Sequence, residues 1–119
     1  MRNVKSYKDL LIWKKGIELV KQVYLLTGSF PAEERFGLIS QLRRAAVSVP
    51  SNMAEGQARK SSAEFVQFLS IAQGSLAELE TQLIISCELG FSNQEGIAKS
   101  IGLIHEIQKM THALKSKVS

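Results

Sequence analysis

The sequence predicts an all-α fold, an up-down-up-down antiparallel four-helix bundle formed by a single domain over residues 1–119. Apolar residues recur at intervals of three and four in four long segments, which is the spacing of one face of a helix. Only a few residues connect these segments, and short connections favour antiparallel neighbours. No segment alternates apolar and polar residues over a sustained run, so we predict no strand.

The first predicted helix covers residues 7–27 and has apolar residues on two faces. Ser6 and Asp9 have the spacing of a capping pair at its start, and Gly28 fits the left-handed residue that often ends a helix. The face predicted to meet the core carries Leu10, Trp13, Ile17, Val20 and Tyr24. The opposite face carries Ile12, Leu19 and Leu26. A single small domain cannot easily cover both faces, so we predict that the second face is an oligomer interface.

The second predicted helix covers residues 31–57, with Pro31 as its first residue. Its inner face carries Leu38, Ile39, Leu42, Ala45, Ala46, Val49 and Met53. Phe36, Val47 and Pro50 fall on an apolar flank beside this face, and we predict that they also contact another subunit. Pro50 cannot donate a hydrogen bond to the preceding turn, so the helix is expected to kink there.

The third predicted helix covers residues 62–89. Ser61 and Glu64 have the spacing of a capping box at its start, and Gly90 is the stop signal. Its core stripe consists of Phe65, Leu69, Ala72, Leu76, Leu79, Leu83 and Cys87. Glu80 lies inside the apolar sector on a helical wheel, so we predict that its carboxylate is a buried polar group or lies at an oligomer interface.

The fourth predicted helix covers residues 93–116, and Ser92 and Glu95 provide a second capping spacing. Its core stripe consists of Ile97, Ile101, Ile104, Ile107, Thr111 and Leu114. Lysines in its last turns suit the negative end of the helix dipole.

Two adjacent arginines, Arg43 and Arg44, interrupt the apolar pattern of the second helix. One of them is predicted to be desolvated at an interface. A buried guanidinium needs a partner, and Glu80 and Glu55 are the candidate carboxylates. The alternative is an arginine that extends along its apolar stem to reach water.

The sequence contains no pattern typical of an enzyme, a cofactor site or a metal site. One cysteine, Cys87, and two histidines, His105 and His112, do not supply the ligands of a zinc site, and phosphate-binding loops and nucleophile motifs are absent. We therefore predict a non-enzymatic protein without cofactor or metal. No apolar run is long enough to span a bilayer, and one cysteine cannot form an internal disulfide. A cytoplasmic protein with no membrane partner is expected.

The formal net charge of +4 favours an acidic partner such as nucleic acid. Antiparallel packing brings the N-terminus, the connection between the second and third helices, and the C-terminus to one end of the bundle. The basic residues predicted to meet there are Arg2, Lys5, Lys8, Arg59, Lys60, Lys115 and Lys117. Such a surface releases counterions from a nucleic-acid backbone, so it is the predicted RNA- or DNA-binding site. The alternative is a solvated, lysine-rich end that only keeps the protein soluble.

Three segments together resemble a known family. They are LLIWKKGIELV in the first helix, FPAEERFGLISQLRRAAVSVPSNMAEG in the second and EFVQFLSIAQGSLAELETQL in the third. The combination resembles the four-helix-bundle family of proteins encoded in intervening sequences of bacterial 23S rRNA genes. It is also similar to the accessory proteins of diversity-generating retroelements. The resemblance implies a cytosolic, ring-shaped homopentamer and implies nucleic acid and a reverse transcriptase as partners.

Two functional hypotheses follow from the residues and the resemblance. The first is a homopentameric helical bundle that binds the RNA or DNA backbone through its basic end, with little sequence specificity. The second is an oligomeric scaffold for a protein partner, such as a reverse transcriptase, without a role in nucleic-acid binding. Segregation of positive charge to one end is needed by the first hypothesis and not by the second.

Overall fold

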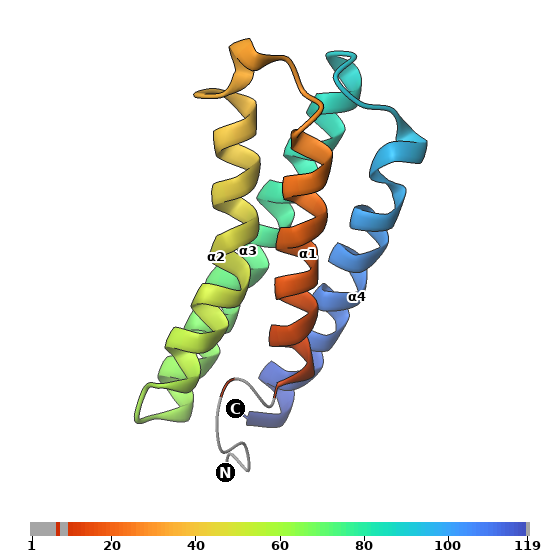
Figure 1. The fold of residues 1–119 in the computed structure, drawn as a ribbon. Coiled ribbons are helices and arrows are strands. Elements are labelled where there is room, and N and C mark those ends of the chain that lie inside the picture. Colours follow the sequence, from red (N-terminus) through yellow and green to blue (C-terminus); the bar gives the residue numbers. More distant parts are fainter. Residues whose placement is uncertain (1–6, 8–9, 119) are drawn as a thin grey trace.

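Four α-helices form an antiparallel bundle in the part of the protein that the computed structural model describes, Tyr7 and residues 10–118 (Figure 1). The elements are α1 (Leu11–Thr27), the 3-10 helix η2 (Ala32–Glu34), α2 (Leu38–Gln57), α3 (Ser62–Glu88) and α4 (Gln94–Val118). Each α-helix packs on the next one along the chain, and α4 packs on α1 to close the bundle. None of the described residues lies in a strand, which confirms the predicted all-α, four-helix fold.

Two of the four helices begin later than predicted. Leu10 is extended, so α1 starts at Leu11 instead of residue 7, and the predicted Ser6–Asp9 cap lies outside the described residues. Pro31 precedes only the short helix η2. The backbone of Gly37 is not helical, and the Glu34 carboxylate accepts a hydrogen bond from the first N–H of α2 at 3.2 Å. The second helix therefore starts at residue 38, and Phe36 lies on the connection before it.

The predicted end signals are partly confirmed. The Ser61 hydroxyl accepts the Glu64 N–H at 3.1 Å, so the capping box of α3 forms as expected. Gly90 has a φ of 81°, which confirms it as the left-handed residue after α3. The cap of α4 is Asn93 instead of the predicted serine, because its side-chain oxygen accepts a backbone N–H at 2.7 Å. Gly28 has a φ of −62°, so the prediction of a left-handed residue there is wrong.

The core contains most of the stripes predicted for α2, α3 and α4. Fully buried side chains of the three predicted stripes include Leu42, Val49, Met53, Phe65, Leu76 and Ile104. Ile39, Cys87, Ile101 and Leu114 are only partly buried. Gly56 lets α2 and α3 approach closely, since a Cβ atom on this residue would lie 2.7 Å from the Phe68 Cβ atom.

The orientation predicted for α1 is wrong for its most buried residues, although Trp13 and Val20 of the predicted core face still pack partly against the core. Ile12 and Leu19 lie in the core with exposed fractions of 4% and 0%, whereas Ile17 and Tyr24 are 39% and 44% exposed. The buried face also contains Gly16, where the absence of a side chain lets α2 approach closely. Close packing therefore decides which face is buried, and the number of apolar residues on each face does not.

The contact between α1 and α2 centres on Gly16 and Pro50. A Cβ atom on Gly16 would lie 3.2 Å from the Pro50 Cβ atom, so the proline ring occupies the space that the glycine leaves. Figure 1 shows that the C-terminal half of α2 leans away from α1. This divergence is the geometry expected of a helix that contains a proline near its middle.

Candidate functional site

The connection between α2 and α3 and the C-terminal end of α4 lie at the same end of the bundle (Figure 1). Three of the predicted basic residues, Arg2, Lys5 and Lys8, lie outside the described residues. The other four are Arg59, Lys60, Lys115 and Lys117, and we call this set the basic end.

Neighbouring side chains hold two residues of the basic end. The Arg59 guanidinium lies 2.7 Å from Glu55 Oε2, and its central carbon lies 4.9 Å from the centre of the Phe68 ring. Lys115 Nζ donates a hydrogen bond to Gln73 Oε1 at 2.9 Å. The Arg59 side chain nevertheless remains 43% exposed. These contacts orient the two cations without removing the arginine from solvent.

Cations outnumber carboxylates at the basic end, where the exposed carboxylates are Glu55 and Glu64. Lys60 and Lys117 are exposed, and the lysines in the last turn of α4 lie where the helix dipole favours cations. The opposite end, with η2 and the connection between α3 and α4, carries the exposed acidic residues Glu33, Glu88 and Glu95. Arg35 and Lys99 are exposed at that end, so it is mixed in charge.

Arg43 is anchored by α1. Its Nε–H donates to Thr27 Oγ1 at 2.9 Å, and its guanidinium lies 4.3 Å from the centre of the Tyr24 ring. Thr27 in turn donates its hydroxyl proton to the Val23 carbonyl at 2.7 Å, so both functions of this buried hydroxyl are used. Arg44 is exposed. The two adjacent arginines therefore have different environments.

The predicted carboxylate partners of these arginines bind other residues. Glu55 pairs with Arg59, and Glu80 Oε2 lies 2.9 Å from His105 Nε2. Within one chain, neither carboxylate forms the predicted ion pair with Arg43 or Arg44. The Glu80 side chain is 32% exposed, so it retains contact with water. The Thr27 hydroxyl and the Tyr24 ring satisfy the partly buried Arg43 guanidinium without an ion pair.

Polar side chains in the middle of α2 bond to nearby groups and do not converge on a site. The Ser48 hydroxyl donates to the Ser75 hydroxyl across the contact between α2 and α3. The Asn52 side-chain amide donates to the Ser48 carbonyl at 2.7 Å. These bonds explain Ser48 and Asn52 as structural residues.

A partly exposed apolar surface runs along α1 and α2, and we call it the α1–α2 surface. Its apolar residues are Trp13, Ile17, Val20, Tyr24, Phe36 and Val47, which line two adjoining hollows. Its cations are Arg35, Arg43 and Arg44, which line the hollow nearer η2. Sequence reasoning placed Phe36 and Val47 at an interface, but it assigned the four α1 residues to the core.

Several other predicted interface residues are not accessible on the monomer. Ile12 and Leu19 are buried in the core, and Leu26 is partly buried against it. Pro50 is buried against Gly16, although its ring also lines one hollow of the α1–α2 surface.

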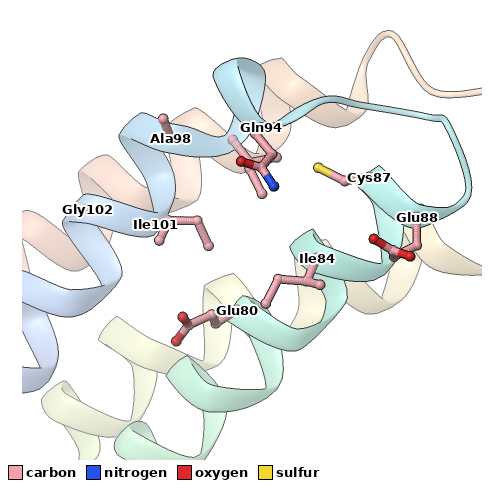
Figure 2. A pocket seen from close by; sticks show the side chains of 9 residues that line it. Glu80, Ile84, Cys87, Glu88, Gln94, Ala98, Ile101 and Gly102 are labelled. Carbon is pink, nitrogen blue, oxygen red and sulfur yellow. The ribbon is translucent and has the colours of Figure 1, made fainter.

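A groove between α3 and α4 was not predicted from the sequence. Its principal residues are Glu80, Ile84, Glu88, Ile97, Ala98 and Ile101, and its volume is about 440 Å³. Figure 2 shows Glu80, Ile84 and Glu88 along α3, with Gln94, Ala98 and Ile101 across from them on α4. Ile84 is 49% exposed. In the sequence, this surface is indicated by Ile84, an apolar residue outside the predicted core stripe of α3.

The described residues contain no group of three histidine, cysteine or acidic side chains that could hold a metal ion. His105 and His112 are exposed, as expected for residues on the flank of α4. No described helix combines the length and apolar content that crossing a membrane requires.

Comparison with known proteins gives one family and a structural neighbour. The model of the 23S rRNA-intervening sequence protein family matches residues 8–113. The fold is similar to a crystal structure from Bacteroides thetaiotaomicron, described as a protein with unknown function from the S23 ribosomal protein family. The TM-score is 0.79 at 23% sequence identity, and the match covers 88% of this chain and 98% of that chain. No curated protein matches the chain.

Proposed function

This chain belongs to the family of 23S rRNA-intervening sequence proteins, and we propose that it is a non-enzymatic bundle that binds the RNA or DNA backbone. The basic end is the proposed binding surface. Its cations come from two segments distant in sequence, the connection between α2 and α3 and the last turns of α4. Phosphate contacts of this kind give affinity with little sequence specificity.

The observation that carries this proposal is the placement of charge. The basic end combines the oriented Arg59 with the exposed Lys60 and Lys117, while exposed carboxylates lie at the opposite end. A nucleic acid that approached the basic end would meet four cations and two exposed carboxylates, Glu55 and Glu64, of which Glu55 is paired with Arg59. It would be distant from the carboxylates of the opposite end. The proposal places this function in the cytoplasm.

Self-association is the second part of the proposal, with a homopentamer favoured by the family resemblance. The α1–α2 surface supports it, because partly exposed Ile17 and Tyr24 and the fully protruding Phe36 form a contiguous apolar area. A cyclic oligomer would align the basic ends on one side. Several weak phosphate contacts would then act together on one nucleic acid.

The same apolar surface supports an alternative function. Phe36 is 90% exposed and has arginines beside it, which is a combination found at protein interfaces. An oligomeric scaffold for a protein partner, such as a reverse transcriptase, would use this surface and would not need the basic end.

Nucleic-acid binding separates the two functions. We expect the wild-type protein to bind a short labelled RNA or DNA duplex at about 50 mM salt and to lose affinity as salt rises. The double variant K60E/K117E should bind more weakly. Its slope of log K against log salt should be smaller by about 1 for each lysine that contacts a phosphate. Fluorescence anisotropy across a salt series measures both quantities.

The matched control is K21E/K99E, which changes two exposed lysines away from the basic end. Each Lys→Glu change lowers the charge by two, so both double variants go from +4 to 0. The control should keep most of the wild-type slope. Absence of wild-type binding at low salt, or equal slopes in the two double variants, contradicts the backbone-binding proposal.

A further inference from the structure

Phe36 is the most exposed large apolar side chain of the described residues, at 90%. It lies between η2 and α2, where the backbone is fixed on both sides. The Glu34 carboxylate accepts the Leu38 N–H at 3.2 Å, and Gly37 supplies the non-helical turn. Burying a large apolar side chain is favourable, so a protruding ring on a fixed backbone favours association.

Two exposed arginines lie beside this ring. Arg35 and Arg44 are exposed, and they line the same hollow as Phe36. No carboxylate is among the described residues that line this hollow. Arg43 also lines it, but its guanidinium is already held by Thr27 and Tyr24. A partner for this surface must therefore offer an apolar recess with acidic groups beside it.

The groove between α3 and α4 has those properties. Glu80 and Glu88 lie on either side of Ile84, with Ile101 across the groove (Figure 2). No lysine or arginine is among its described lining residues. Its volume of about 440 Å³ exceeds the roughly 150 Å³ of a cavity that holds a benzene ring. A phenyl ring fits, and its neighbouring arginines would meet carboxylates.

The two surfaces also have compatible positions. Phe36 precedes the start of α2, while Glu88 ends α3 and Gln94 begins α4, so both surfaces lie at the same end of the antiparallel bundle. They lie on different sides of the bundle, because Phe36 belongs to a hollow lined by α1 and α2 residues and the groove is lined by α3 and α4 residues. Two copies placed side by side with parallel bundle axes would therefore bring the two surfaces together at the same height.

We propose that Phe36 of one copy inserts into the groove between α3 and α4 of a second copy, with Arg35 and Arg44 facing Glu80 and Glu88. The contact is heterologous, because each copy uses a different surface toward each neighbour. Such contacts close into a ring when the rotation between copies allows it. This inference rests on the proposed self-association and specifies which surfaces form it.

Two single variants test the contact. F36D removes the inserting ring, and I84R blocks the groove with a cation. Both positions are exposed, at 90% and 49%, so each variant should keep its helical content by circular dichroism. L25D is the matched control, because Leu25 is 81% exposed and lies on neither surface. Sedimentation velocity should show monomers for F36D and I84R, and the wild-type oligomer for L25D.

Mixing the two variants tests whether the contact is heterologous. F36D keeps an intact groove and I84R keeps an intact ring, so the equimolar mixture should form a dimer with one productive interface. A mixture that remains monomeric, while each variant is folded, contradicts the heterologous arrangement. F36D that assembles like the wild type overturns the docking of Phe36.

The outcomes distinguish this inference from the proposed function. A wild-type oligomer that is unaffected by F36D and I84R overturns only the proposed contact. A wild-type protein that stays monomeric overturns this contact and the self-association part of the proposed function. Backbone binding by the basic end is decided separately by K60E/K117E, whose two positions lie on neither docking surface.

Discussion

Replacing Leu19 with alanine is expected to lower the free energy of unfolding by about 2–5 kcal/mol, because it creates a cavity at a fully buried position of α1. The same substitution at Leu25, in the same helix but 81% exposed, should change stability by no more than about 0.5 kcal/mol. Domains of this size have total stabilities of about 5–15 kcal/mol, so the substitution at Leu19 removes a large share of the total stability.

Urea unfolding at several protein concentrations measures the free energies of unfolding of L19A and L25A. The structure places Leu19 inside each monomer, so the stability lost in L19A should not depend on protein concentration. The arrangement predicted from the sequence, with Leu19 at an oligomer interface, would give a loss that varies with concentration. Equal stabilities of L19A and L25A would contradict the observed orientation of α1.

Arg43→Ala is expected to destabilise the protein by about 1–3 kcal/mol, whereas Arg44→Ala should change its stability by no more than about 0.5 kcal/mol. The first variant loses the bond to Thr27 at 2.9 Å and the contact with the Tyr24 ring at 4.3 Å. Arg44 is exposed. Adjacent residues of one type should therefore differ strongly in their effect.

Thermal and urea unfolding of the two arginine variants provide the measurement, at protein concentrations low enough that association does not contribute. Arg43→Lys is a further variant, since an ammonium group retains the charge but lacks the planar guanidinium that lies over the ring. It should be less stable than the wild type. Equal losses in R43A and R44A would mean that the anchoring to α1 contributes nothing.

The fold and the stripes of α3 and α4 were predictable because apolar residues recur at intervals of three and four along one face of each helix, although α3 also carries exposed Ile71, Ile84 and Ile85 off that stripe. Ser61 and Gly90 also mark the ends of α3 with side-chain and backbone geometry that depends only on local sequence. In these segments the local signals and the packing agree.

The orientation of α1 was not predictable from periodicity, because both faces are apolar. Gly16 determines the buried face through its contact with Pro50, and the Thr27 hydroxyl is accommodated there by a bond to a backbone carbonyl. Glycine and threonine do not count as apolar in a helical pattern. The predicted start of α2 was wrong for a different reason: Gly37 interrupts the helix that Pro31 was expected to begin.

The candidate sites were predictable where topology alone brings residues together. The antiparallel order placed Lys60 and Lys117 at one end correctly. The groove between α3 and α4 required the relative rotation of two helices, which the sequence does not specify. Glu80 was singled out as a carboxylate in the apolar sector, but its bond to His105 depends on that same rotation.

Sedimentation of the wild-type protein with a labelled RNA duplex tests the central claim most directly. At micromolar protein and about 50 mM salt, the account predicts an oligomer that carries the duplex with it, and that releases the duplex without dissociating as salt rises. A monomer under these conditions, or an oligomer that sediments without the duplex at low salt, would contradict it.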